Sequence, residues 1–139
     1  MKVLGLDGRE HSWNLTKSKY RFGNKNCSKN HKKARFVLKD LFPHDIILEE
    51  VTLPGSATVS RKNPLYADFF LPSQSLIIEV HGEQHYTYNN FFYKTKQEFY
   101  KAKARDRDKE EWCDLNSIDI VVLDHKATKD EWKQQINSR

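Results

Sequence analysis

Two acidic residues and a histidine stand at strand-like positions in the middle of this chain. Asp68 lies in the segment YADFF, and Glu79 and His81 lie in the apolar segment SLIIEVH, residues 75–81. Side chains alternate between the two faces of a strand, so Glu79 and His81 share one face. If the two segments pair through the short turn at residues 72–74, Asp68 approaches Glu79 on that face.

Two neighbouring carboxylates in an apolar setting are unfavourable unless a positive charge offsets them. One solution is a salt bridge to Lys or Arg, but residues 63–93 contain neither. The other solution is a divalent metal with hard oxygen ligands, most often Mg²⁺. The sequence therefore favours a metal site held by Asp68 and Glu79 over a purely structural pair of carboxylates.

The pattern resembles the active-site hairpin of the PD-(D/E)XK nucleases, which carry an acid on one strand and Glu-x-Lys on the next. Here the segment YADFFLPSQSLIIEVHG supplies an acid and then Glu-Val-His, in which His replaces the usual Lys. That replacement makes the chain more similar to the very-short-patch-repair endonucleases and the EDxHD homing endonucleases. Asp68 matches their first Asp, His81 their histidine, and Asp106, in KARDRDKEEW, their final Asp. The resemblance covers residues 28–123.

This resemblance implies metal-dependent hydrolysis of phosphodiester bonds in DNA, with Mg²⁺ as the metal and Mn²⁺ as a substitute. Asp68 and Glu79 would hold the metal, which stabilises the charge that develops on the scissile phosphate. His81, a residue type with an ordinary pKa of about 6.5, would accept a proton from the attacking water. Asp106 would orient that histidine or a metal-bound water.

Asp106 has an unusual place for an acid. On a helical wheel it falls beside Ala102 and Cys113, on the stripe expected to face the sheet. The alternative to a role in the site is an ion pair within the helix, with Lys103 or Lys109.

The chain departs from the family pattern in its first helix and its metal content. The family places its first glutamate in that helix, but residues 28–41 contain no Glu. His31 stands near the expected place, and Glu49 or Glu50 on the first strand are substitutes. The very-short-patch enzymes also carry a structural zinc, for which the two distant cysteines of this chain do not suffice.

The segment HGEQH also fails to predict zinc. Histidines four residues apart usually bind a metal from a helix, whereas His81 ends a strand and a glycine follows it. Glu83, Gln84 and His85 remain accessory candidates for the site.

The elements that must position these residues predict an α/β domain. Helices are expected over residues 28–41, 94–116 and 128–137, and strands over residues 45–53, 65–71, 75–81 and 118–123. Ser28 and Thr128 are the expected helix caps. Three meandering strands and a helical crossover to a fourth predict a mixed four-stranded sheet flanked by helices. The resemblance makes this αβββαβ order a restriction-endonuclease-like core, preceded by a short β-hairpin around Asp7.

A single domain of 139 residues is expected. We divide it into a basic N-terminal extension (1–27), a catalytic core (28–123) and a C-terminal helix (124–139). Neither a membrane span nor a signal peptide is visible, and two cysteines are too few for a disulfide framework, so an intracellular, cytoplasmic protein is expected. The resemblance adds a phage or mobile-element origin as a hypothesis.

Charge is unevenly distributed along the chain. Residues 1–40 hold eleven Lys and Arg against three Asp and Glu, whereas residues 41–93 hold two against six. The basic arm suits the phosphates of double-stranded DNA, and a solubilising surface is the alternative. The expected phosphate-binding residues are Lys25, Lys29, Lys32, Lys33 and Arg35. No dimer element is visible, so we expect a monomer or a weak dimer that nicks one strand at a time.

Other interpretations stay open. Five of the eight residues in YTYNNFFY, 86–93, are aromatic; they either stack on bases or pack a loop against the core. The domain can also be a catalytically silent nucleic-acid-binding module on the same fold, or a nuclease directed at RNA.

Overall fold

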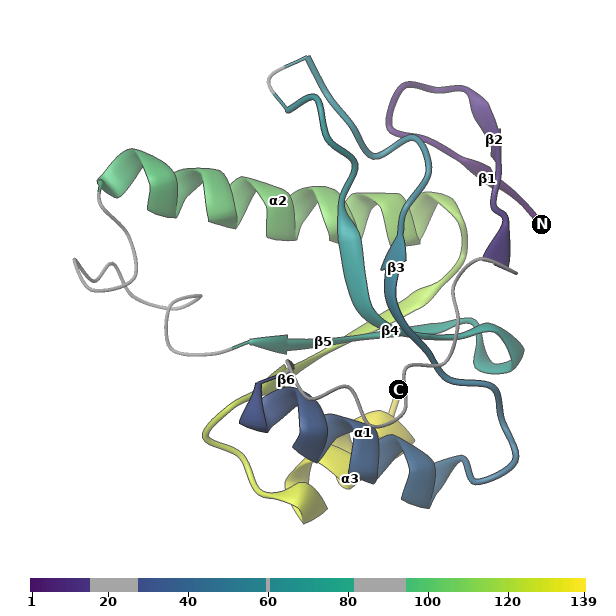
Figure 1. Ribbon diagram of the computed structural model, residues 1–139, viewed down its shortest axis with the longest axis vertical. Coiled ribbons are helices and arrows are strands. Elements are labelled where there is room, and N and C mark those ends of the chain that lie inside the picture. Colours follow the sequence, from purple (N-terminus) through teal and green to yellow (C-terminus); the bar gives the residue numbers. More distant parts are fainter. Residues whose placement is uncertain (16–27, 60, 82–94) are drawn as a thin grey trace.

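The computed structural model of this chain describes residues 1–15, 28–59, 61–81 and 95–139. A four-stranded sheet lies at its centre (Figure 1), with strand order β3-β4-β5-β6. The strands are β3 (Leu48–Thr52), β4 (Tyr66–Leu71), β5 (Leu76–His81) and β6 (Asp119–Asp124). The first three are antiparallel neighbours, and β6 pairs with β5 in parallel. The predicted mixed four-stranded sheet is confirmed.

Three helices accompany the sheet: α1 (Lys29–Leu41), α2 (Lys96–Leu115) and α3 (Lys129–Asn137). Each begins at a residue whose side-chain oxygen accepts a main-chain N–H of the first turn, and these caps are Ser28, Thr95 and Thr128. Glu131 bonds back to Thr128 and completes a capping box. The two predicted caps, Ser28 and Thr128, are therefore confirmed. Within the described ranges, no helix combines the length and apolar character needed to span a bilayer.

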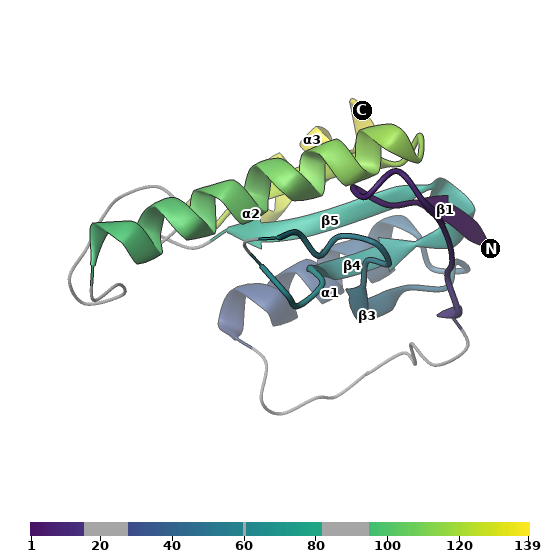
Figure 2. The same ribbon diagram turned by 90° about the horizontal axis from the view of Figure 1, so that it is seen from above.

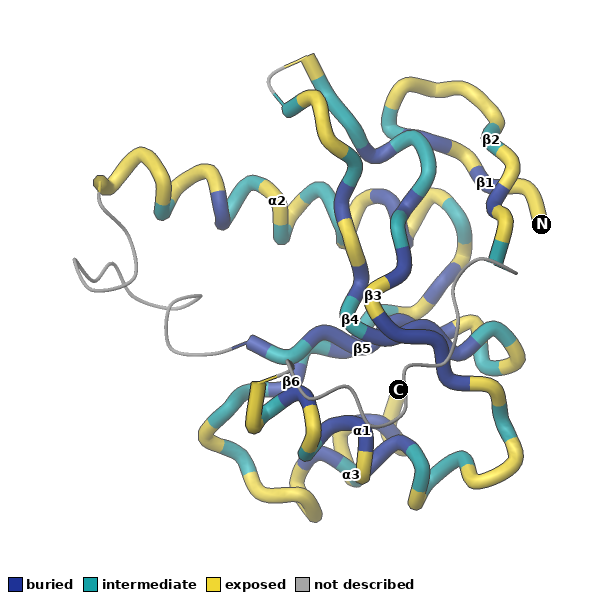
Figure 3. The backbone as a smooth tube through the Cα atoms, viewed as in Figure 1, coloured by how far each residue is buried: buried dark blue, intermediate teal, exposed yellow. Residues whose placement is uncertain are grey.

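The sheet separates two layers. α1 and α3 pack on one face, and α2 packs on the other together with a two-stranded hairpin, β1 (Lys2–Leu4) and β2 (Glu10–Ser12). Figure 2 shows α2 running alongside β5. Because helices cover both faces, β5 is buried along nearly its whole length (Figure 3): Ile77 joins the cluster under α2, and Ile78 joins the cluster under α1 and α3.

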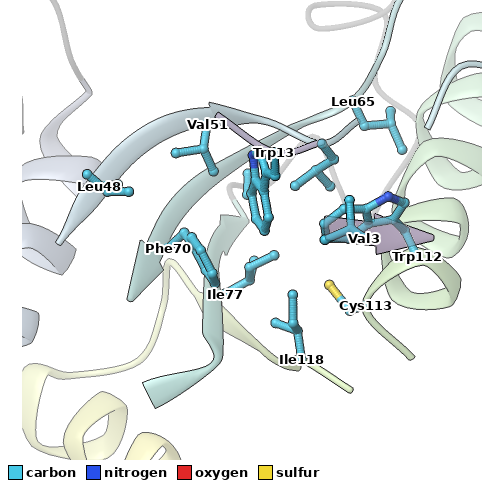
Figure 4. Close-up of a cluster of buried hydrophobic side chains, with 12 residues drawn as sticks. Val3, Trp13, Leu48, Val51, Leu65, Phe70, Ile77, Trp112, Cys113 and Ile118 are labelled. Carbon is cyan, nitrogen blue, oxygen red and sulfur yellow. The ribbon is translucent and has the colours of Figure 1, made fainter. Parts of the chain in front are cut away.

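An aromatic group fills the core on the α2 face (Figure 4). Trp13 stacks on Phe70 with ring centroids 4.6 Å apart, and it meets Trp112 edge-on at 5.2 Å. Val3 and Trp13 are buried in this cluster. The N-terminal hairpin, expected from the sequence as an extension, is therefore part of the packed core.

Polar bonds fix the hairpin to the rest of the domain. The side-chain amide of Asn116, just after α2, bonds both the N–H and the carbonyl of Leu4, at 2.7 and 2.9 Å. The N–H of Leu6 donates to the carbonyl of Gly55 at 2.8 Å. At this contact Gly55 has a φ of 75° and lies against Gly5, so a side chain at Gly55 would meet main-chain atoms.

We predict that Gly55→Ala destabilises the domain far more than Gly8→Ala. Both glycines have positive φ, which costs an alanine about 1 kcal/mol. Around Gly8 an added Cβ would meet nothing within 4 Å, whereas at Gly55 it would lie 2.6 Å from the Cα of Gly5. Urea unfolding should therefore show a loss of about 1 kcal/mol for Gly8→Ala and about 2–4 kcal/mol for Gly55→Ala. Equal losses would contradict this close backbone contact.

Candidate active site

The β4–β5 hairpin brings Asp68 and Glu79 together, as the sequence predicts. A short 3₁₀ turn, Pro72–Gln74, joins the two strands, and Phe69 pairs with Ile78. Continuing this register sets Asp68 opposite Glu79. The N–H of Asp68 donates to Glu79 Oε2 at 2.9 Å, and the N–H of Val80 donates to Asp68 Oδ2 at 2.9 Å. Each carboxylate thus accepts a main-chain N–H of the opposite strand.

Glu79 is the most strongly perturbed acid of the described site. Its residue is only 2% exposed. Burial, reinforced by the negative charge of Asp68, raises the pKa of Glu79 to about 8, although the ammonium of Lys109 pulls it down. At neutral pH this carboxyl therefore carries a large electrostatic penalty for ionising.

Sequence analysis did not predict the cation that lies beside Glu79. Lys109 reaches from α2 to Glu79 Oε1, and its side chain is 19% exposed. The argument that no Lys or Arg lies near the acids was wrong, because it considered only residues close in the chain. Helical spacing could have predicted this contact, because Lys109 lies three residues after Asp106 on the stripe of α2 that faces the sheet.

His81 and Asp106 meet across the gap between β5 and α2. His81 Nε2 lies 3.8 Å from Asp106 Oδ1, and their side chains are 11% and 19% exposed. Ala102 and Cys113, on the same stripe of α2, are buried against the sheet as predicted. The distance exceeds that of a hydrogen bond but allows a strong electrostatic interaction when the imidazole is protonated.

A small cavity joins these groups. It measures about 10 Å³ and is lined by Glu79, His81, Asp106, Lys109, Glu110, Ile120 and Val122. This is room for about one water-sized group. Three of the four candidate catalytic residues therefore line one small cavity. Asp68 is not among its lining residues, but its N–H is bonded to Glu79.

The carboxylates offer the oxygen atoms that Mg²⁺ prefers, but in this structure they are largely engaged. One oxygen of each accepts a main-chain N–H, and Lys109 contacts the other oxygen of Glu79. Within the described ranges, no set of three or more His, Cys, Asp or Glu side chains is grouped to hold a metal. A metal ligated by both carboxylates would therefore compete with Lys109 for Glu79.

The candidates for the missing helix glutamate separate onto two sides. Glu50 has a φ of 52° and is exposed, and its flanking pairs in the β3–β4 register bring it next to Asp68. Glu49 instead points toward α1, where it is 3% exposed. It accepts two bonds from Arg35, at 2.9 and 2.8 Å, and lies 2.6 Å from His31 Nε2.

The negative charge of Glu49 is offset by its neighbours His31 and Arg35. Burial raises its pKa, but the hydrogen bonds from His31 and Arg35 and their charges outweigh burial and leave the pKa of Glu49 lowered. His31 also stacks on Phe69 at 4.3 Å. This group of Glu49, His31 and Arg35 lies on the α1 side and does not join Glu79 and His81.

The predicted phosphate-binding residues are distributed unevenly. Lys29 and Lys32 are exposed on α1. Lys33 lies over the ring of Trp132 at 4.1 Å, and Arg35 is buried on Glu49. Lys25, the accessory candidates Glu83, Gln84 and His85, and the aromatic segment 86–93 lie outside the described residues.

The raised pKa of Glu79 gives a pH-dependent stability. The native state retains a proton that the unfolded state, in which the carboxyl has its ordinary pKa of 4.5, has already lost. The contribution of this carboxyl to stability is therefore fully present below about pH 4.5 and is lost as pH rises toward 8. In EDTA, we expect this group to remove a few kcal/mol over that window. Urea unfolding of Glu79→Gln should show a flatter dependence on pH than the parent.

Glu111→Gln, an exposed change of the same chemistry on α2, is the matched control and should keep the parental dependence. If the parent and Glu79→Gln lose stability equally between pH 5 and 8, the buried carboxyl is not the group that titrates.

Comparison with known proteins assigns no family. No family model matches the chain, and no solved structure matches it. The chain is 34% identical over 78 residues to "Uncharacterized protein 033L" of Invertebrate iridescent virus 3. The match covers 52% of this chain and 40% of the viral protein, so the chain spans about two fifths of the length of this curated relative.

Proposed function

We propose that this protein is a metal-dependent DNA endonuclease of the PD-(D/E)XK type, closest to the very-short-patch-repair and EDxHD enzymes. The observation that carries the proposal is that Glu79, His81 and Asp106 line one small cavity between β5 and α2, while Asp68 is hydrogen-bonded to Glu79 across the β4–β5 hairpin. The αβββαβ order around the mixed sheet supports a restriction-endonuclease-like core.

In the proposed mechanism Asp68 and Glu79 would hold Mg²⁺, or Mn²⁺ in its place. When bound, the metal supplies charge stabilisation at the scissile phosphate. His81 accepts the proton of the attacking water, and Asp106, 3.8 Å from its ring, favours the protonated imidazole that results. The ordinary pKa of a histidine suits a base at neutral pH, whereas a lysine would need a strongly lowered pKa.

The raised pKa of Glu79 supports a cation at this place. Its cause is burial together with the charge of Asp68, which Lys109 offsets only in part. A divalent cation held by Asp68 and Glu79 would favour the ionised form of Glu79, so metal binding would release a proton and weaken as pH falls. Lys109 would then be displaced from Glu79 and left beside the anionic substrate.

A second function is favoured by that same ion pair. Lys109 already neutralises one charge of the acid pair, which suits a catalytically silent nucleic-acid-binding module on the same fold. A nuclease needs the two acids to cleave nucleic acid, whereas a silent module binds nucleic acid without cleaving it. The same cleavage assay, run with RNA and with DNA, shows which of the two is the substrate.

We predict that Asp68→Asn abolishes Mg²⁺-dependent cleavage of supercoiled plasmid while the protein stays folded. The change removes a ligand charge, yet Asn retains an oxygen that can accept the N–H of Val80. Asp114→Asn, an exposed change on α2, is the control and should cleave normally. Near-parental cleavage by Asp68→Asn would refute the site, and absence of metal-dependent cleavage of plasmid, mismatched duplex and RNA by the parent would favour the silent module.

His81→Ala should lower the single-turnover cleavage rate by roughly 10²- to 10⁴-fold, the span usual for loss of a general base. His85→Ala should lower it much less, because the proposal assigns the base to His81, whose Nε2 lies 3.8 Å from Asp106 Oδ1. An equal or reversed ranking of the two variants would assign the base to the other histidine.

Because one hairpin supplies one set of acids, a monomer faces one phosphodiester at a time. Supercoiled plasmid should therefore pass through a nicked circle before linear product accumulates. Direct conversion of supercoiled to linear DNA at limiting enzyme would instead indicate a working dimer.

A further inference from the structure

A basic cleft opens between the β3–β4 loop and the first half of α2. It has a volume of about 120 Å³ and is lined by Arg61, Lys101, Ala104 and Arg105. Among the described residues that line it, three are cations and the fourth, Ala104, has a small side chain. The volume accommodates several water-sized groups, so an oxyanion can enter it.

Arg61 is held in place for such a role. Its guanidinium donates to Asp108 of α2 at 2.9 Å and to the carbonyl of Ser56 at 2.7 Å. Ser56 is fully buried, and its hydroxyl ties the loop together by donating to Leu53 and accepting from Leu65. The loop therefore presents Arg61 from a fixed position, which lowers the entropy lost when an anion binds.

The charge of the cleft is positive on balance. Three cations and Asp108 give 3 − 1, a formal charge of +2. Lys101 and Arg105 are exposed, and the described residues form no ion pair that neutralises either of them. Figure 3 shows this half of α2 mostly exposed. The cleft thus offers two cations that no described residue neutralises, Lys101 and Arg105, beside Arg61, which is already bonded to Asp108 and Ser56. The planar guanidinium of Arg105 suits phosphate oxygens.

The cleft lies beside the candidate active site rather than behind it. Arg105 directly precedes Asp106 on α2, and successive helix positions are about 100° apart around the axis. The same two turns of α2 therefore present Asp106 and Lys109 to the sheet and Arg105 and Lys101 to the cleft. The exposed lysines of α1, Lys29 and Lys32, lie on the layer beyond the opposite face of the sheet.

From this placement we propose that the cleft binds the phosphate backbone of duplex DNA next to the scissile phosphate, and that it, rather than α1, anchors the substrate. The inference rests on the proposed function for the identity of the anion. Contacts of this kind position a nucleic acid and carry no sequence information, so the cleft sets where the backbone enters the site.

The test is binding of a fluorescent 20-bp duplex by anisotropy over a range of salt, in EDTA so that no cleavage occurs. Lys101→Gln/Arg105→Gln should weaken binding and lower the slope of log affinity against log salt by about 1–2, since each lost phosphate contact removes roughly 0.9. Both side chains are exposed, so an unchanged thermal unfolding midpoint is expected.

Two double variants are matched controls with the same loss of charge. Lys96→Gln/Arg107→Gln neutralises exposed cations on the other side of α2, and Lys29→Gln/Lys32→Gln neutralises the exposed lysines of α1. Both should keep a slope near that of the parent. The inference is overturned if the cleft variant binds like the parent, if either control flattens the slope as much, or if the parent fails to bind the duplex.

Because binding is measured without metal, its outcome is separate from that of cleavage. Loss of binding in the cleft variant supports the cleft even when the parent shows no nuclease activity. A variant that loses single-stranded RNA but retains duplex DNA would overturn the assignment to DNA.

Discussion

The site depends on one arrangement, in which the carboxylates of Asp68 and Glu79 take over hydrogen bonds of the hairpin. The N–H groups of Asp68 and Val80 donate to these side chains, so the acids are built into the strand pairing. Ionising a buried carboxyl beside a like charge is unfavourable, and the raised pKa of Glu79 reflects this. Lys109, which α2 brings to Glu79, offsets part of that negative charge.

The two buried glutamates of the described residues have opposite environments. Glu49 receives Arg35 and His31 on the α1 face, and the pKa of Glu49 falls. Glu79 receives one lysine and an aspartate neighbour, and the pKa of Glu79 rises. A glutamate whose partners satisfy it is accounted for by stability alone. The charge of Glu79 is compensated only in part, although the same fold compensates that of Glu49 fully. A buried acid with a perturbed pKa of this kind is typical of functional sites.

Sequence reasoning succeeded where the determinants are local. Alternation along residues 75–81 places Glu79 and His81 on one face, helical spacing puts Asp106 on the inner stripe of α2, and the caps Ser28 and Thr128 mark helix starts. It failed where the determinant is a contact between distant segments. Lys109 lies 30 residues from Glu79, and only the docking of α2 on the sheet reveals their pairing. The burial of Trp13 beside Phe70 and Trp112 depends on the same packing and has no local signature.

The packing of α2 therefore decides where Asp106, Lys109 and the basic cleft lie relative to the two strand carboxylates. Its C-terminal half is fixed by Trp112 and Cys113 in the core, and Trp112 also donates to the carbonyl of Pro54 at 2.8 Å. That bond ties the helix to the start of the loop that carries Arg61, and the pair of Arg61 and Asp108 ties it again nearer the cleft. Two anchors on one loop hold the helix at a fixed rotation. At that rotation Asp106 and Lys109 face the strand acids while Arg105 faces outward, so a single helix places the basic cleft next to the candidate active site.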